Sequence, residues 1–245
     1  MKEVKKTICS NITVIIPTLN EEENIEEVIL GLKQMGYTNI LVVDARSTDR
    51  TVEIAQKLGA RIIFQNGNGK GDALRHAFFK ENNNCDVIVI MDADGSMDPR
   101  EIPSFLEALE SGADVVKGSR FLSYAYSKDM TLIRKIGNRL LLFAVNLLHS
   151  TKYTDLCYGF GAFTTESIKR LYPHLKSKNF EIEAEVFIKA KKLGLKIVEV
   201  PSIEYERKNG NSNLDSFRDG FSILKTILRE ALDNDYLNSQ SGKLI

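Results

Sequence analysis

Two carboxylates stand two residues apart where a short apolar run ends. Val87 to Met91 reads as a buried strand and leads directly into Asp92-Ala93-Asp94. Side chains two apart on an extended segment point the same way, so both acids face one point. Hard oxygen donors beside a substrate phosphate are the ligands that Mg²⁺ or Mn²⁺ prefers. The spacing therefore indicates a divalent metal site, with a pair of solvated loop acids as the alternative.

Polar residues also follow three other runs that read as strands. These are 12–16 before Pro17-Thr18-Leu19-Asn20-Glu21, 40–43 before Asp44, and 61–64 before the turn 66–71. The carboxyl ends of strands in an open parallel sheet line one crevice. We therefore expect a nucleotide pocket at this edge. Asp44 would hydrogen-bond the base or ribose, and Lys70 would reach a diphosphate.

Three other motifs resemble this pattern and fail on particular residues. No Ser or Thr follows Lys70, which excludes the ATPase phosphate loop, and the nearby glycines lack the dinucleotide-binding spacing. A calcium loop starting at Asp92 would need Gly where Met97 stands and Glu where Pro103 stands. The nucleotide pocket remains the better interpretation.

The first half alternates short apolar runs with helical periodicity, which predicts an α/β fold with a mostly parallel sheet and helices on both faces. Helices are expected over 25–35, with Asn20 as N-cap, and over 52–58, with Thr48 or Asp49 as N-cap. Two more helices are expected, one over 71–80 and one that starts at Pro99, and a strand is expected over 113–116. The second half is less regular. It predicts one or two helices over 130–149, an extended piece over 159–164, a helix over 180–193, strands over 196–200 and 203–205, and a last helix carrying Leu214, Phe217, Phe221, Leu224 and Leu228.

Composition limits the possible classes of function. The chain has 245 residues, 43% of them hydrophobic, and Lys plus Arg equals Asp plus Glu at 33 each. This predicts one domain with a sizeable core and no global basic field for nucleic acid. Cys9, Cys85 and Cys157 are odd in number and far apart, which favours a reducing cytoplasm over disulfides or zinc. We expect neither a signal peptide in residues 1–10 nor an apolar run of the roughly 20 residues that span a bilayer.

Several motifs in a fixed order carry a family resemblance. VIIPTLNEEENI, VVDARSTDRT, GKGDAL, VIVIMDADGSMDPREIP and KGSRF resemble the family-2 glycosyltransferases of GT-A fold. DLCYGFGAF, FEIEAE and IVEVPSIEYERKNGNSNL narrow the resemblance to the dolichyl- or polyprenyl-phosphate glycosyltransferase branch. The match covers roughly residues 12 to 230. It implies a single Rossmann-like domain with a donor-binding half at about 10–120, an acceptor-binding half at about 121–232, and a frayed tail at 233–245.

The resemblance also implies roles for particular residues. Asp92 and Asp94 become the metal ligands, and Asp94, Arg134 and Arg207 the catalytic residues. The nucleotide-sugar contacts would be Pro17, Thr18, Glu21, Asp44, Lys70, Asp92, Ala93 and Arg120, and the acceptor-phosphate contacts Arg134, Asn138 and Arg207. The chain departs from the family pattern at two positions, because Ala45 often is Asp in the family and Ser96 often is Gln in mannose-transferring members.

The implied reaction is the inverting transfer of a hexose, with Mg²⁺ or Mn²⁺, to a dolichyl or polyprenyl phosphate. The donor would be GDP-mannose, UDP-glucose or UDP-N-acetylglucosamine. A phosphate monoester with a second pKa of about 6 is already ionised at neutral pH, so this acceptor needs no general base. Glu181, Glu183 and Glu185 are therefore left outside the catalytic set as first-turn charges of a helix. The alternatives are a family member acting on a soluble or saccharide hydroxyl, and a non-catalytic nucleotide-sugar-binding module.

The lipid acceptor implies a membrane surface, and possibly a membrane-embedded partner, at the cytoplasmic face. The stretch 134–149 is basic at its start and then rich in Leu, Phe and Val. It predicts either an amphipathic helix at the headgroup zone or a helix buried against the sheet.

Overall fold

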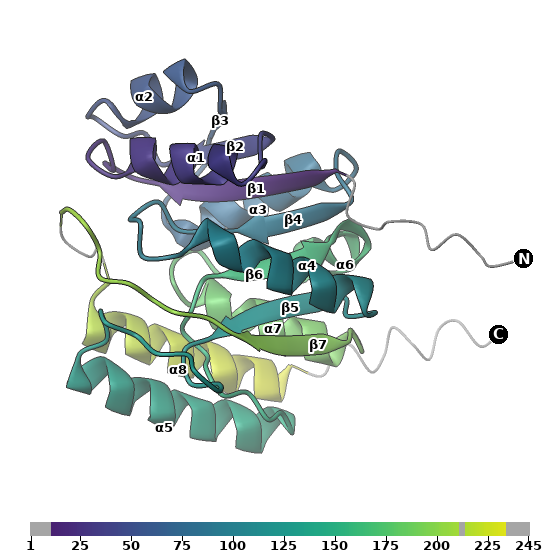
Figure 1. Ribbon diagram of the computed structural model, residues 1–245. Coiled ribbons are helices and arrows are strands. Elements are labelled where there is room, and N and C mark those ends of the chain that lie inside the picture. Colours follow the sequence, from purple (N-terminus) through teal and green to yellow (C-terminus); the bar gives the residue numbers. More distant parts are fainter. Residues whose placement is uncertain (1–10, 211–213, 234–245) are drawn as a thin grey trace, which may run out of the picture.

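The computed structural model describes residues 11–210 and 214–233, and one seven-stranded sheet runs through both halves of this chain (Figure 1). The strand order is β3-β2-β1-β4-β6-β5-β7. Only β6 among the described strands is antiparallel to its neighbours β4 and β5. The strands are β1 (Ile12–Thr18), β2 (Ile40–Asp44), β3 (Arg61–Phe64), β4 (Val87–Ile90), β5 (Val115–Ser119), β6 (Gly161–Thr164) and β7 (Ile197–Pro201). The predicted α/β fold with a mostly parallel sheet is confirmed.

Helices cover both faces of this sheet. One layer holds α1 (Ile25–Gln34), α2 (Thr51–Lys57) and α4 (Ile102–Glu110), the last preceded by the short 3₁₀ helix η1 (Pro99–Glu101). The other layer holds α3 (Lys70–Glu81), α5 (Leu132–His149), α6 (Thr165–Leu171), the 3₁₀ helix η2 (Tyr172–His174), α7 (Ile182–Lys192) and α8 (Ser216–Leu232). α5 and α8 contact each other beyond the edge of the sheet (Figure 1).

Strand β1 shows why the buried strands are continuously apolar. Val14 and Ile16 pack into the α1–α4 layer, while Ile15 between them packs into the opposite layer. Successive strand side chains point to opposite faces, so a sheet that is covered on both sides needs apolar residues at every position.

Two expected boundaries were wrong, one at the end of the first strand and one at the start of the first helix. β1 does not end before Pro17 but runs to Thr18, paired with β2. The pairing with β4 stops at Ile15, and the missing N–H of Pro17 would have faced that side, so the proline removes no ladder bond. Asn20 is not the N-cap of α1, since the cap position is Asn24 and Asn20 adopts a φ of 54° in the turn.

In the second half, α5 is one helix across Gly137 and Asn138 rather than two. The predicted strand over 203–205 was wrong, because Glu204 makes only an isolated bridge with Ser127. Helix α6 was not predicted. No helix among the described residues is long and apolar enough to cross a membrane. The predictions on residues 1–10, including Cys9, and on the tail from 234 onward lie outside the described residues.

Candidate active site

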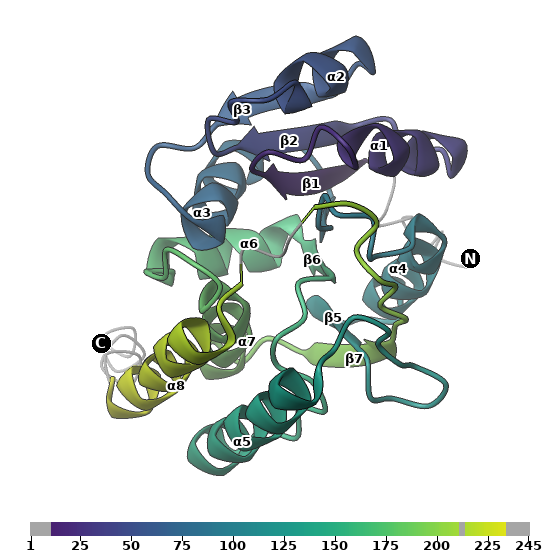
Figure 2. The same cartoon turned by 90° about the vertical axis from the view of Figure 1, so that its left-hand side faces the viewer.

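A cavity of about 440 Å³ opens at the carboxyl ends of the parallel strands, the ends that face the viewer in Figure 2. It brings together residues that are far apart in the chain, from the turn after β1 to the start of α8. All the site residues expected from the sequence line it except Asp44. They are Pro17, Thr18, Glu21, Lys70, Asp92, Ala93, Asp94, Arg120, Arg134, Asn138 and Arg207.

Lys70 bridges two acids that line the cavity. Its ammonium lies 2.6 Å from Asp92 Oδ1 and 2.7 Å from Glu183 Oε1. Burial lowers the pKa of Lys70, but Asp92 and Glu183 outweigh this effect, so the net pKa is raised and the lysine stays charged. Burial raises the pKa of Asp92 to about 6, although the charge of Lys70 opposes it. Gly159 packs so closely here that a Cβ would lie 2.5 Å from Lys70 Nζ.

Arg207 forms the second bridge between acids of the cavity. Its guanidinium donates to both carboxylate oxygens of Glu21 at 3.0 and 3.1 Å and lies 3.4 Å from Asp94 Oδ2. The other oxygen of Asp94 accepts a hydrogen bond from the backbone N–H of Ser96. This hydrogen bond fixes the Asp94 side chain in the turn that follows β4.

The Asp92–Asp94 pair fits a metal that arrives with a substrate phosphate. The described residues contain no group of three or more His, Cys, Asp or Glu side chains placed to hold a metal by themselves. Mg²⁺ and similar ions, however, are commonly held by one or two carboxylates together with substrate phosphates and water. Asp92 and Asp94 supply two such carboxylates beside Lys70, which suits a diphosphate.

Asp44 has a different environment from the one expected. Its carboxylate is fully buried and accepts hydrogen bonds from the backbone N–H and the hydroxyl of Ser47 and from the hydroxyl of Thr18. It does not line the cavity. Asp44 therefore fixes the turn after β2, in which Arg46 has a φ of 64°.

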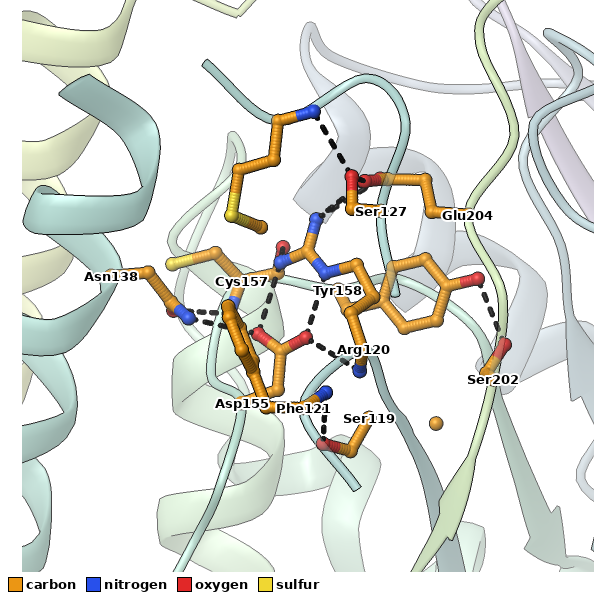
Figure 3. Close-up of polar contacts among 12 residues, drawn as sticks. Ser119, Arg120, Phe121, Ser127, Asn138, Asp155, Cys157, Tyr158, Ser202 and Glu204 are labelled. Carbon is orange, nitrogen blue, oxygen red and sulfur yellow. Dashed lines mark hydrogen bonds and ion pairs between the residues drawn. The ribbon is translucent and has the colours of Figure 1, made fainter. Parts of the chain in front are cut away.

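Arg120 is the centre of a polar network that Figure 3 shows in close-up. Its guanidinium binds Asp155 at 2.7 and 2.9 Å, Glu204 at 3.0 Å and the carbonyl of Cys157 at 2.6 Å. It also lies 4.8 Å from the ring centre of Tyr158. Because every guanidinium nitrogen already donates to the protein, Arg120 is better placed to hold the cavity wall than to bind a donor phosphate.

Electrostatics agree with this structural role. Burial lowers the pKa of Arg120, but Asp155 and Glu204 raise it by more. Burial raises the pKa of Asp155, and the Arg120 charge more than reverses the effect. Both groups are thus ionised in a nearly water-free environment, where removal of either leaves a costly unpaired charge.

One face of α5 forms part of the cavity wall. Arg134 and Asn138 stand four residues apart and therefore on the same side of the helix. Arg134 lies 3.2 Å from Asp129 and keeps 27% of its side chain exposed. Asn138 is buried, donates to Asp155 and accepts from the backbone N–H groups of Leu156 and Cys157. Arg134 thus lines the cavity with part of its side chain exposed, and Asn138 anchors the helix.

Residues 202–210 follow β7 and pass across the carboxyl edge of the sheet (Figure 2), and Glu204 and Arg207 among them line the cavity. The backbone N–H of Tyr205 donates to the carbonyl of Ser96, and Lys208 forms an ion pair with Glu27 of α1. Asn209 hydrogen-bonds Asn24. Arg207 is thereby held over the carboxylates of β4.

Helices α5 and α8 each expose an apolar row. On α5 it comprises Ile136, Leu140, Phe143 and Leu147, here called the α5 stripe, and on α8 it comprises Phe217, Phe221, Leu228 and Leu232, the α8 stripe. Leu141 of α5 and Ile223 of α8 instead line the cavity. Thus 134–149 is neither fully buried nor fully exposed: one side packs inward and the stripe faces solvent.

Sequence reasoning missed or set aside three polar residues of this site. Glu183 was left out as a helix-start charge, yet it binds Lys70; its place in the FEIEAE motif was the available signal. Asp155 stands in the DLCYGFGAF motif, but nothing local indicates that it pairs with Arg120. Gln65 lines the cavity directly after β3 and was not singled out at all.

Comparison with known proteins gives concordant results. The family model described as Glycosyl transferase family 2 matches residues 13–172. A dolichyl-phosphate hexose transferase of Haloferax volcanii is 31% identical over 91% of this chain and 95% of its own length. A UDP-N-acetylglucosamine–dolichyl-phosphate N-acetylglucosaminyltransferase of Methanococcus voltae is 30% identical over 91% of this chain and 98% of its own length.

Among solved structures, glucosyl-3-phosphoglycerate synthase of Mycobacterium tuberculosis has a similar fold. It superposes with a TM-score of 0.73 at 24% identity and covers 91% of this chain and 81% of that one. That protein was crystallised with Mn²⁺, UDP and its product. At this level of identity the likeness concerns the fold.

Proposed function

The chain belongs to glycosyl transferase family 2 and has the GT-A fold, and from this premise we propose that it transfers a hexose from a nucleoside-diphosphate sugar to a dolichyl or polyprenyl phosphate with inversion. The support is one observation. A single cavity holds acids and a lysine suited to a metal-bound diphosphate together with Arg134 and Arg207. Relatives over nearly the full chain carry dolichyl phosphate in their names.

The acceptor chemistry fits the charges of the cavity. A lipid phosphate is a nucleophile without deprotonation, since its second pKa is about 6. It needs cations that hold it in line with the anomeric carbon, and arginine binds phosphate with two parallel N–H groups. We assign Arg134 and Arg207 to this task. Arg207 must then exchange part of its contact with Glu21 or Asp94 for the phosphate.

The donor chemistry fits the lysine and the acids of the same cavity. Lys70 would hold the diphosphate, and Asp92 and Asp94 would hold Mg²⁺ or Mn²⁺. When bound, the metal would neutralise charge that develops on the leaving nucleoside diphosphate. The relatives' names include both hexose and N-acetylglucosamine, so the proposal leaves the sugar open.

A saccharide hydroxyl acceptor is less well supported. It would need a carboxylate base near the anomeric carbon. Of the acids that line the cavity, Asp92 and Glu183 both bind Lys70, and Glu21 and Asp94 both contact Arg207. The two others, Asp129 and Glu204, pair with Arg134 and Arg120. Because each of these carboxylates is already engaged by a cation, an acceptor that is ionised without a base is favoured.

We further propose that the protein works at the cytoplasmic face of a membrane. The α5 stripe and the α8 stripe are exposed rows of large apolar side chains on the two helices whose other sides line the cavity. Lys135 and Arg139 of α5 are exposed beside the α5 stripe and complement anionic headgroups. This arrangement places the acceptor side of the cavity next to the lipid.

The test is a transfer assay with purified protein, a short polyprenyl phosphate and Mn²⁺ or Mg²⁺, with UDP-glucose, UDP-N-acetylglucosamine and GDP-mannose compared as donors. We expect a β-linked sugar phosphate from an α-linked donor, identified by NMR, and no product with the unphosphorylated polyprenol or with EDTA. Asp94→Asn should abolish turnover. Asp86→Asn, at the opposite end of the same strand, is the matched control. Transfer to a free saccharide, or an α-linked product, would overturn the proposal.

A further inference from the structure

The side-chain carbonyl of Gln65 is a buried hydrogen-bond acceptor without a partner. Gln65 follows β3 directly and is 1% exposed. Among the described residues, the buried side-chain oxygens without a hydrogen-bond partner are Gln65 Oε1, Ser177 Oγ and Glu181 Oε2. Of these three residues, Gln65 is the one that lines the cavity. An unsatisfied buried carbonyl is costly, so its place in a binding cavity points to a ligand group that satisfies it.

The orientation of the Gln65 amide is fixed by its neighbours. Its Nε2 donates to the carbonyl of Gly67 at 3.0 Å, and its backbone N–H donates to the carbonyl of Asp44 at 3.0 Å. Turning the amide over would set two carbonyl oxygens 3.0 Å apart, which is repulsive. The group that Gln65 offers to a ligand is therefore an acceptor.

The surroundings of Gln65 suit a neutral planar ring. Pro17, Leu19 and Ala45, at the ends of β1 and β2, line the cavity together with Gln65. The ion pair of Lys70 and Asp92 lines the same cavity. A donor whose diphosphate lies at Lys70 would thus have its nucleobase between the ends of β1, β2 and β3. The carboxylate of Asp44 already accepts hydrogen bonds from Ser47 and Thr18, so another residue must recognise the base.

We propose that Gln65 determines nucleobase specificity by accepting a hydrogen bond from a ring N–H of the donor's base; this inference rests on the proposed function. Uracil at N3 and guanine at N1 carry such a hydrogen. Cytosine at N3 and adenine at N1 present a lone pair at the corresponding position, which would face the Gln65 carbonyl as a second acceptor. The site therefore selects uridine or guanosine diphosphates and rejects cytidine and adenosine diphosphates.

The Oε1 atom of Gln65 must become accessible for this hydrogen bond to form. Gln65 Oε1 has no contact with solvent, whereas the adjoining turn 66–68 is exposed. Gly67 is tied to the rest of the molecule through a hydrogen bond from its N–H to Asp72. A shift of this exposed turn on entry of the base would open Oε1 to the ring N–H.

Isothermal titration of the protein with UDP, GDP, CDP and ADP in the presence of Mn²⁺ tests the inference without any acceptor. We expect UDP or GDP to bind at least about tenfold more tightly than CDP and ADP. Gln65→Met has a similar volume and no acceptor; it should weaken the preferred nucleotide about tenfold and bring the four affinities together. Gln56→Met, on the exposed side of α2, is the matched control and should leave all four affinities unchanged.

The outcomes separate the two proposals. If wild-type protein binds CDP or ADP as tightly as UDP and GDP, or if Gln65→Met keeps the wild-type preference, the role of Gln65 is overturned while sugar transfer stands. If no nucleoside diphosphate binds, both proposals fail. Gln65→Met removes an unsatisfied carbonyl rather than a buried charge, so a folded variant is expected, as checked by its thermal unfolding.

Discussion

The guanidinium of Arg207 lies 3.4 Å from the carboxylate of Asp94 while it also holds Glu21. Lys70 stands in the same relation to Asp92, at 2.6 Å. Each carboxylate proposed as a metal ligand is thus already neutralised by a cation of the protein. Substrate phosphates would draw both cations away and free the acids, so metal and nucleotide are expected to bind together.

Removal of Lys70 tests this coupling. With Lys70→Met the acids Asp92 and Glu183 lose their shared cation, and the site becomes more negative. We expect Mn²⁺ alone to bind about tenfold more tightly than to wild-type protein, and UDP or GDP to bind about tenfold more weakly. Electron paramagnetic resonance measures bound Mn²⁺. The control Lys80→Met, at the other end of α3, should change neither the Mn²⁺ affinity nor the nucleotide affinity. Equal Mn²⁺ affinity in Lys70→Met and wild type would refute the coupling.

Arg207→Met should separate catalysis from donor binding. If Arg207 grips the acceptor phosphate, its loss lowers transfer by about a hundredfold, the usual effect of removing one donor that stabilises a reacting oxyanion. Binding of the nucleoside diphosphate, measured by calorimetry, should change much less. Arg50→Met serves as control, since Arg50 pairs with the acid Glu22 at the surface. A variant that keeps wild-type turnover would remove Arg207 from the catalytic set.

The apolar stripe of α5 leads to a prediction about lipid binding. Phe143 is 69% exposed on α5, and Phe79 is 58% exposed on α3, away from the cavity. Phe143→Asp places a charge on the proposed lipid-facing surface and should reduce flotation with anionic liposomes at least severalfold. Phe79→Asp should leave flotation unchanged. Equal flotation of both variants and the wild type would exclude this stripe as the lipid contact.

The sequence predicted the strands best where both faces of the sheet are covered. β1, β2 and β4 are continuous apolar runs because each side chain packs into one of two cores. β6 was less clear, since Gly161–Thr164 is short and carries a glycine and an alanine. Helix α6 was missed because Ile168 and Leu171 are the only large apolar side chains among its seven residues, too few to establish a period of 3.6.

For the site, strand-end spacing predicted which side chains share a cavity but not which of them are already paired. Arg120 and Asp155 lie 35 residues apart, and no local pattern shows that they bind each other. Asp44 looked like a ligand because it follows a strand, yet Ser47 and Thr18 use its oxygens. Gln65 became visible only through the orphaned carbonyl that burial creates. Such pairings depend on tertiary packing.

The network of Arg120 predicts a large loss of stability when it is broken. Arg120→Met leaves Asp155, which is 0% exposed, without its main partner, and breaking a buried pair costs about 3–5 kcal/mol. For a chain of this size that loss lowers Tm by about 10 °C. Arg100→Met, at an exposed pair with Asp98, should leave Tm close to that of the wild type. A Tm equal to the wild type would show that Arg120 is instead free for a ligand.

The pair between α7 and α8 predicts how stability depends on pH. Glu230 is buried and lies 2.9 Å from Lys189 and 3.2 Å from Lys192. Burial raises the pKa of Glu230, but the two lysines outweigh it and the net pKa falls below the ordinary value of 4.5. A carboxylate with a lowered folded-state pKa stabilises the protein fully above its unfolded-state pKa, and this contribution is lost as the pH falls through the folded-state pKa.

Glu230→Gln should therefore unfold more easily than the wild type at pH 7, by about 3–5 kcal/mol, because Lys189 remains charged at 1% exposure. The difference should shrink as the pH falls below 4.5, where the wild-type carboxylate begins to take up its proton. Urea unfolding at pH 7 and at successively lower pH measures both quantities. The control Glu107→Gln, on the exposed side of α4, should have the same free energy of unfolding as the wild type at every pH. A constant gap between Glu230→Gln and wild type across this range would show that packing, rather than the charge of Glu230, holds α8 against α7.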